Sequence, residues 1–266
     1  MMKYSLFCSG SKGNSFYLAD GDVHLLVDCG ASKHRIMDGF TNFHANVQDL
    51  DAILITHNHS DHISALKYFK NYLIYAPINL DDIPVTLIAA DKPFNIKHLK
   101  IVPIALSHDA GSTLGYVFDN GQERLLYMTD TGYLHEKYFS YLKGLDYIVI
   151  ESNHDVEMLM HTNRPYYLKR RILSDEGHLS NNSCANILEH IVTTKTKYIW
   201  LAHLSQEANT PKLALQCSLN VLRKIPTNSQ LMIAAAEQFR PLKKGDQDEE
   251  MDFGNYYSFV NMESFS

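Results

Sequence analysis

Short apolar segments separated by turn residues make up the first part of the chain. The segments YSLFCSG, SFYLAD and VHLLVDCG, within residues 4–30, are each bounded by Gly, Ser, Asn or Asp, as the strands of a meander are. A continuous apolar run at residues 50–56, LDAILIT, has the length of a strand that is covered on both faces. The next segment, HISALKYFKNY, has apolar residues at helical spacing and predicts a helix over residues 62–72.

The second half of the chain repeats this alternation. Strands are predicted at HLKIVPIALSH, GYVFDN, RLLYMTD, LDYIVIES and KYIWLAHLS, and helices at GYLHEKYFSYL and NNSCANILEHIV. Strands that end in polar residues, with helices between them, are typical of a layered α/β sandwich. We therefore expect one folded domain over residues 1–242. From Lys243 the composition turns to KKGDQDEEMD, so residues 243–266 are predicted to be an acidic C-terminal tail that is flexible or peripherally docked.

Composition places the chain among ordinary globular proteins. Its 266 residues are 45% hydrophobic and 20% charged, which is the range of a packed domain. No apolar run is long enough to span a bilayer, and the N-terminal segment lacks the apolar core of a signal peptide. The four cysteines have no CxxC spacing and indicate reduced thiols. We expect a cytoplasmic protein with no membrane partner.

Histidine is the unusual feature of the composition, with 14 residues, and several of these follow the predicted strand at residues 50–56. In THNHSDH, His57 and His59 alternate along an extended segment and therefore point the same way, while Asp61 and His62 come on the next turn. This spacing can supply two adjacent ions, because imidazole nitrogen and carboxylate oxygen suit Zn or Mn. The alternative, polar residues on an exposed loop, does not explain why they directly follow a buried strand.

The motif THNHSDH after a buried strand resembles the signature of the metallo-β-lactamase superfamily. Further elements follow in that family's order: VDCG with Asp28, SHDA with His108, TDTG with Asp130 and LAHLS with His203. The segments SGSKGN, ESNHDVEML, LKRRILSDEGHLSN and LAHLSQEANTP are similar to the bacterial YycJ (WalJ, VicX) branch. The resemblance covers nearly the whole chain and implies a four-layer αββα sandwich.

The resemblance implies a site for two divalent metal ions, Zn or Mn/Fe. It assigns His57, His59 and His108 to one ion, and Asp61, His62 and His203 to the second ion. It assigns Asp130 to the bridge between the two ions. Two such cations share a hydroxide, which is the nucleophile, and clamp the attacking and leaving oxygens of a phosphodiester. Taken alone, His108 and His203 are typical of surface histidines and Asp130 of a helix N-cap; their order after predicted strands favours the ligand interpretation.

The resemblance also implies a proton donor. Many secreted β-lactamases of this superfamily have a cysteine where this chain has Asp130, whereas the phosphodiesterase branches, including tRNA-processing nucleases, have an all-His/Asp set with a distant Glu and His. Glu151 and His178 match that pair in order and context, which implies that His178 is the general acid and that Glu151 fixes its tautomer and raises its pKa. The alternative for His178 is a loop or capping residue before a helix that begins near Ser180. Asp61 either orients the attacking water or is only a ligand.

Substrate contacts are expected from two loops and a basic triplet. The candidates are Ser9, Asn14, Asn153, His154, Lys169, Arg170 and Arg171. The SGSKGN loop can present N–H groups and hydroxyls to a phosphate, although a plain hairpin turn is the favoured interpretation. Asn153 and His154 lie at a predicted strand end. Contact with substrate and hydrogen bonds to the backbone of a local turn are equal alternatives for them. The basic triplet precedes His178 and either contacts phosphates or is a solvated charged face.

These observations predict a two-metal-dependent phosphodiester hydrolase, a nuclease that acts on DNA with the 5′–3′ exonuclease-like activity that the branch implies. A small-molecule (cyclic) phosphodiesterase is the first alternative, because the net charge of −6 does not require a polyanionic partner. A thioester or lactone hydrolase of the same fold is the second, and it does not need the Glu151–His178 pair. A non-catalytic metal-binding module is the third. No feature of the sequence specifies an oligomeric state.

Overall fold

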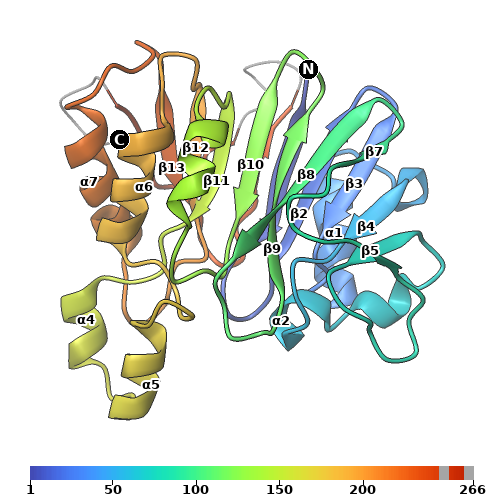
Figure 1. Ribbon diagram of the computed structural model, residues 1–266, viewed down its shortest axis with the longest axis horizontal. Helices are drawn as coiled ribbons and strands as arrows, with labels where there is room; N and C mark the ends of the chain where they lie inside the picture. Colours follow the sequence, from blue (N-terminus) through green and yellow to red (C-terminus); the bar gives the residue numbers. More distant parts are fainter. Residues whose placement is uncertain (246–251, 261–266) are drawn as a thin grey trace.

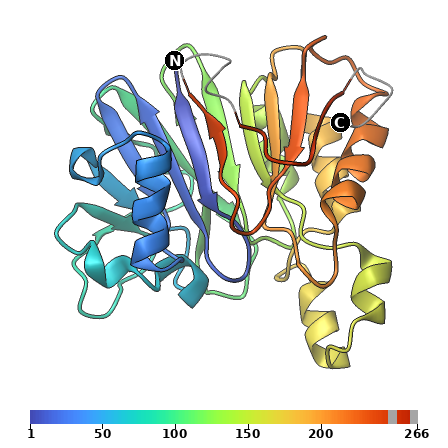
Figure 2. The ribbon, with the colours of Figure 1, turned by 180° about the vertical axis from the view of Figure 1, so that it is seen from behind.

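Two mixed β-sheets lie face to face in the computed structural model, and helices cover their outer faces (Figure 1, Figure 2). The structure describes residues 1–245 and 252–260. Buried apolar side chains fill the space between the sheets and the space between each sheet and its helices. Burial of apolar surface on both faces of each sheet is what holds such layers together. The expected α/β sandwich with four layers, αββα, is confirmed.

The first sheet is antiparallel on one side and parallel on the other. In order across the sheet, its strands are β14 (Leu242–Lys244), β1 (Lys3–Cys8), β2 (Ser15–Asp20), β3 (Val23–Val27), β4 (Ala52–Leu54), β5 (Ile74–Ala76) and β6 (Thr86–Leu87). β14, β1, β2 and β3 pair antiparallel, whereas β3, β4, β5 and β6 run parallel. Val27 of β3 lies opposite Leu54 of β4. The residues that follow these two strands therefore leave the sheet at the same edge.

The second sheet has its parallel strands in the middle. In order, its strands are β15 (Tyr257–Phe259), β13 (Met232–Ala235), β12 (Tyr198–Ala202), β11 (Tyr147–Glu151), β10 (Arg124–Met128), β9 (Thr113–Asp119), β8 (Leu99–Leu106) and β7 (Phe94–Ile96). β10, β11, β12 and β13 run parallel, and the remaining pairs are antiparallel. Ile150 of β11 lies between Met128 of β10 and Leu201 of β12. The segments after these three strands therefore also begin at one edge.

Helices flank both sheets, and one pair projects away from them. The helices are α1 (Lys33–Asn42), α2 (Ser60–Ile63), α3 (Phe139–Leu142), α4 (Val156–His161), α5 (Tyr166–Ile172), α6 (Asn181–Ile191) and α7 (Pro211–Leu222), with 3-10 turns η1 (Val47–Asp49), η2 (Leu66–Tyr68) and η3 (Glu136–Tyr138). In Figure 1 the α4–α5 pair extends below the sheets, at the end where α2 lies, and Figure 2 shows the same projection from behind. Among the residues that the structure describes, no helix is long and apolar enough to cross a membrane.

Aromatic residues dominate the core between the sheets. Tyr4 of β1 packs against Trp200 of β12 with ring centroids 4.6 Å apart, and Phe16 of β2 packs against Tyr127 of β10 at 4.8 Å. All four side chains are almost completely buried. Such pairs contribute about 0.5–1.5 kcal/mol beyond the burial of their area. They fix the two sheets relative to each other and so hold in place the strand ends that carry the polar residues.

The helix predicted over residues 62–72 is wrong, because α2 ends at Ile63 and only the separate turn η2 follows it. The hydroxyl of Ser64 donates to the carbonyl of Gly30, and the N–H of Ala65 donates to the carbonyl of Cys29. The bond from Ala65 to the loop after β3 takes the place of the bond that would continue the helix. The helix predicted over residues 132–142 is also shorter than expected, since η3 and α3 cover residues 136–142 only.

The segment predicted as a tail contributes one strand to each sheet. β14 spans the boundary expected between residues 242 and 243 and pairs with β1, while β15 pairs with β13. Lys244 is buried and its Nζ donates to the carbonyl of Met2 at 2.6 Å. The acidic stretch at residues 246–251 and the last residues, 261–266, lie outside the described residues. The described part of this segment is therefore docked on the sheets, and the division into domain and tail stays a prediction.

Candidate active site

Residues that follow strands of both sheets meet at one end of the sandwich. Asp28 follows β3, Asp130 lies two residues after β10, and His203 follows β12. All three have positive φ angles, 62°, 58° and 56° respectively. Residues other than glycine seldom adopt this left-handed conformation, and those that do are enriched at functional sites. The backbone is therefore held in a costly conformation at three points that bring polar side chains into one cluster.

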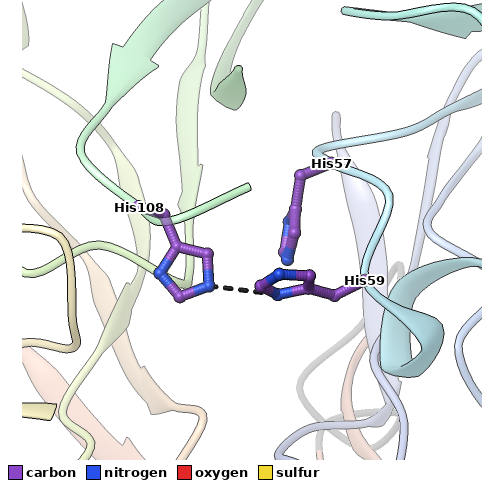
Figure 3. A group of neighbouring side chains, drawn as sticks. All are labelled: His57, His59 and His108. Carbon is purple, nitrogen blue, oxygen red and sulfur yellow. Dashed lines mark hydrogen bonds between the residues drawn. The ribbon is translucent and has the colours of Figure 1, made fainter. Parts of the chain in front are cut away.

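Three histidines from two loops form one side of the cluster. His57 and His59 lie on the loop after β4, and His108 lies on the loop after β8. Their ligand atoms all lie within 4.8 Å of one another, and Nε2 of His108 is 3.3 Å from Nδ1 of His59. Figure 3 shows the three rings converging on one space. This arrangement matches the three-histidine set of a metal site.

Two carboxylates and two histidines form the adjacent side. The ligand atoms of this second group, Asp61, His62, Asp130 and His203, also lie within 4.8 Å of one another. Asp130 is central, because its oxygens lie 3.0 Å from Nε2 of His62 and 3.4 Å from Nε2 of His203. The rings of His57 and His62 are 4.0 Å apart and join the two groups. The structure thus brings all the predicted metal ligands together, while the bridging position of Asp130 stays a prediction.

The ligand histidines are oriented by acceptors behind them. Nδ1 of His62 lies 2.7 Å from Oδ2 of Asp28, and Nδ1 of His203 lies 2.9 Å from Oε1 of Glu151. A carboxylate that accepts from Nδ1 fixes the tautomer and leaves Nε2 as the ligand atom. His62 and His203 are therefore oriented in the same way, each by one buried carboxylate that lies beside its Nδ1.

The donor atoms fit divalent metal ions. Nε2 of His57 and Nε2 of His203 are buried and have no hydrogen-bond partner among the residues that the structure describes. A buried polar atom left without a partner costs about 1–3 kcal/mol, and a bound cation removes that cost. Histidine nitrogen together with carboxylate oxygen is the donor set of ions such as Zn and Mn. The cluster is therefore a site for divalent metal ions.

The electrostatics of the cluster favour the metal-binding forms of His57 and Asp130, whereas His62 holds a proton. Burial and the neighbouring His62 hold the pKa of His57 far below its ordinary value, so this imidazole is neutral. Burial alone would raise the pKa of Asp130, but His203 and His62 hold it well below the usual range, so the carboxylate is ionised. Burial opposes the charge on His62, yet Asp130 and Asp28 raise its pKa to about 10. Metal binding at His62 therefore displaces a proton.

Glu151 lies between a metal ligand and the predicted general acid. Its Oε1 is 2.8 Å from Nδ1 of His178 and 2.9 Å from Nδ1 of His203, and its Oε2 accepts from the backbone N–H groups of Thr131 and Leu179. Burial alone would raise the pKa of Glu151, but His178 and His203 lower it to about 2. The ionised carboxylate therefore orients two imidazoles, whereas the sequence predicted only its contact with His178.

Comparison with known proteins identifies the family. A family model described as a beta-lactamase superfamily domain matches residues 24–204. The chain belongs to this superfamily. It is 36% identical to the exodeoxyribonuclease YycJ of Bacillus anthracis over 84% of this chain and 90% of that protein, and 36% identical to the exodeoxyribonuclease WalJ of Streptococcus pneumoniae serotype 2 over 83% and 88%. The predicted resemblance to the YycJ branch is confirmed.

A solved structure confirms the metallo-β-lactamase fold of this superfamily member. The metallo-β-lactamase fold protein YhfI from Bacillus subtilis superposes with a TM-score of 0.67 at 15% sequence identity, over 91% of this chain and 99% of that chain. At this level of identity the likeness concerns the fold. The superfamily chain therefore has the architecture that the motif THNHSDH implied.

Ser9 and Asn14 support the ligands instead of facing a substrate, which corrects their predicted role. Both side chains are buried. Oγ of Ser9 accepts from the backbone N–H of His203 at 2.8 Å. Oδ1 of Asn14 accepts from the N–H of Gly10 at 2.8 Å, and its Nδ2 lies 3.0 Å from Nε2 of His62. Their polar atoms hold two of the three loops that carry the second group of ligands, the loop of Asp61 and His62 and the loop of His203.

Asn153 contacts His203, and the neighbouring His154 has buried ring nitrogens without a partner among the described residues. Nδ2 of Asn153 donates to the carbonyl of His203 at 2.8 Å. His154 is buried, and neither of its ring nitrogens has a hydrogen-bond partner among the described residues. Burial lowers the pKa of His154 to about 4, so the ring is neutral. Both ring nitrogens of His154 are therefore buried without a partner in the described part of the chain, and its contact with substrate stays a prediction.

The structure separates the members of the basic triplet. Nζ of Lys169 is buried and donates to two backbone carbonyls, one in α4 and one just after it, at 2.6 and 2.7 Å. This structural role replaces its predicted contact with phosphate. Arg170 is exposed, and Arg171 forms an ion pair with Asp109, the residue after a metal ligand. Of the triplet, the two arginines are exposed, and Arg171 is held by Asp109.

Three residues of the site were not among the predicted ones. Asp28 accepts from the hydroxyl of Thr56 at 2.9 Å, and that hydroxyl is 3.0 Å from Nδ1 of His57. Asp109 lies 3.5 Å from Nε2 of His108. All three stand in or beside quoted motifs, because Asp28 is in VDCG, Thr56 opens THNHSDH and Asp109 is in SHDA. A polar residue next to a ligand motif is the signal that would have found them.

Gly30 is where the loop after β3 passes closest to the ligand loop, since a Cβ there would lie 1.5 Å from the carbonyl oxygen of Asp61. We expect Gly30→Ala to lower the free energy of unfolding by about 3 kcal/mol, because the loops would have to separate. Urea denaturation measures this. Gly144→Ala is the control: no atom lies within 4 Å, but φ is +76°, so strain alone costs about 1 kcal/mol. Equal losses in both variants would contradict the explanation.

Proposed function

We propose that this superfamily chain is a two-metal-dependent phosphodiester hydrolase that degrades DNA as a 5′–3′ exonuclease. The observation that carries the proposal is the Glu151–His178 pair, which lies beside the metal ligands. A phosphodiester needs a proton on its leaving oxygen, and a positioned histidine supplies one. Thioester and lactone hydrolysis do not need this pair. The relatives named exodeoxyribonucleases, which match over most of their length, support DNA as the substrate.

The residues divide into an ion-binding part and a proton-donating part. Two divalent ions, Zn or Mn/Fe, supply Lewis acidity and an activated water when bound. Their proposed ligands are His57, His59 and His108 for one ion, Asp61, His62 and His203 for the other, and Asp130 between them. Glu151 holds the ring of His178, which donates a proton to the leaving oxygen. Asp61 is the more exposed carboxylate of the cluster and orients the attacking water. Asn153, His154, Arg170 and Arg171 contact the substrate.

The proposal is tested with purified protein, Mn²⁺ and a panel of labelled substrates. We expect release of labelled mononucleotides from 5′-labelled DNA, and loss of this activity on chelation with EDTA, because the ligand groups hold the ions that the chemistry needs. Tritium-labelled tRNA precursor, bis-p-nitrophenyl phosphate and a thioester are the comparison substrates. Cleavage of only the small diester would overturn the nuclease assignment. Cleavage of only the thioester would overturn phosphodiester hydrolysis altogether.

We also propose that the protein works in the cytoplasm. All four cysteines are unpaired, and Cys8, Cys29 and Cys184 are buried. Burial raises the pKa of each of these three thiols, which keeps them in the unreactive protonated form. Unpaired cysteines are typical of a reducing compartment.

A further inference from the structure

The helix α5 presents two tyrosines and two arginines on one exposed face. Tyr166 and Tyr167 are 67% and 74% exposed, the highest values among the large hydrophobic side chains of the described residues. Arg170 follows Tyr166 by four residues, and Arg171 follows Tyr167 by four. Residues four apart lie one above the other on a helix. We call these four side chains the tyrosine–arginine face.

The opposite side of α5 is anchored, so the orientation of this face is fixed. Ile172 packs with Leu159 of α4 and with Ala208, and Leu168 joins the same cluster. The buried Nζ of Lys169 ties α5 to the carbonyls at the end of α4. A helix held by apolar packing and charged hydrogen bonds does not need to reorganise when a ligand binds.

The tyrosine–arginine face begins at the metal centre. Arg171 pairs with Asp109, and Asp109 lies 3.5 Å from Nε2 of His108 and 3.8 Å from Nε2 of His59. One helical turn of about 5.4 Å separates Arg171 from Tyr167. The α4–α5 pair projects beyond the sheets (Figure 1, Figure 2), so the face leads from the ligands away from the body of the protein.

We propose that the tyrosine–arginine face binds the single-stranded stretch of a nucleic acid whose adjoining phosphodiester lies at the metal centre. This inference rests on the proposed function and specifies how its substrate is held. Exposed tyrosines stack on bases of any sequence, and arginines pair with the phosphates between them. The chain has a net charge of −6, so a polyanion must be held by a local basic segment. The exposed residues of the segment YYLKRRI of α5 include two arginines, and the segment has no acidic residue.

Binding and kinetics with a single-stranded oligonucleotide of about 12 nucleotides test the proposal. The metal-loaded Tyr166→Ala/Tyr167→Ala variant should bind a fluorescent phosphorothioate version at least about 10-fold more weakly, because each stacked base loses its partner. KM for the cleavable oligonucleotide should rise by a similar factor, with a much smaller change in kcat. The Tyr166→Phe/Tyr167→Phe variant should bind like the wild type, since the ring alone stacks. Arg170→Ala should lower the slope of log Kd against log salt by about 0.7.

A matched control removes an exposed tyrosine elsewhere. Tyr141 lies on α3, which precedes β11, whereas the site lies at the other end of that strand. Tyr141→Ala should leave Kd and KM unchanged. The proposal is overturned if the alanine double variant binds the oligonucleotide as the wild type does, or if the phenylalanine variant loses binding equally. It is also overturned if the tyrosines are needed for binding to phosphatidylglycerol vesicles but not to the oligonucleotide.

The two proposals fail in different ways. In the first case, the wild-type protein cleaves DNA, and the tyrosine variants have the same Kd and KM as the wild type. The proposed function then stands, and the proposal for the tyrosine–arginine face is overturned. A wild-type protein that cleaves no phosphodiester overturns the proposed function. In that case, tyrosine-dependent binding of the oligonucleotide still supports the face as a nucleic-acid surface, and its absence overturns the face as well.

Discussion

Replacement of Asp130 by asparagine is expected to lower kcat/KM for a phosphodiester by about 10³-fold or more, because a charge that organises the whole cluster is removed. The oxygens of Asp130 lie 3.0 Å from Nε2 of His62 and 3.4 Å from Nε2 of His203. Asparagine keeps the shape of the side chain and tolerates the φ of 58°. The loss therefore reports the charge and not a misfolded loop. Metal content per chain should fall together with activity.

The control for Asp130→Asn removes a carboxylate that has no part in the site. Asp38 lies on α1, is exposed, and pairs only with the exposed His34 in the ion pairs of the described residues. Asp38→Asn should keep full activity and metal content, since exposed pairs contribute about 0–1 kcal/mol. If Asp130→Asn kept both its metal and a rate within about ten-fold of the wild type, the carboxylate would not be the central ligand that the proposed mechanism requires.

The clustering of the predicted metal ligands could be foreseen because the family motifs that carry them follow successive predicted strands. His57, His108, Asp130 and His203 each follow a predicted strand, and the strands end at the same edge of the sandwich. The motif supplied the order, and parallel pairing in the fold supplied the proximity. Asp28 also follows a strand, but its role depends on Val27 lying opposite Leu54, which sets Asp28 beside Thr56. That non-local register is not visible in the local pattern.

The errors have the same physical origin, namely contacts between segments far apart in sequence. The helix predicted after Asp61 stops because Ala65 bonds to Cys29 rather than along the helix. The pattern of hydrophobic residues contains no information about that partner. Likewise, three adjacent basic residues look alike in the sequence, yet only Lys169 faces the free carbonyls at the end of α4. Helix phase relative to a neighbouring helix decides which charge is buried.

Replacement of His178 by alanine is expected to lower kcat on DNA by about 10²–10⁴-fold with little change in KM, because the leaving oxygen loses its proton donor. Nδ1 of this ring lies 2.8 Å from Oε1 of Glu151. The centroid of the ring lies 5.1 Å from that of His108 and 5.2 Å from that of His203. His178 lies outside the three-histidine set, but one of its ring nitrogens lies within 4.8 Å of ligand atoms of Asp130, Glu151 and His203. Single-turnover measurements separate loss of chemistry from loss of binding.

The leaving group distinguishes a proton donor from a residue that supports the metals. Bis-p-nitrophenyl phosphate releases nitrophenolate, which departs readily without a proton, so His178→Ala should slow its hydrolysis by less than about ten-fold. His190→Ala removes an exposed histidine on α6 and should affect neither substrate. If His178→Ala slowed DNA and the nitrophenyl ester by the same factor, the ring would act by holding the ligand cluster, through the Oε1 atom of Glu151 that it shares with His203. A large difference between the two substrates is the result that identifies His178 as the general acid.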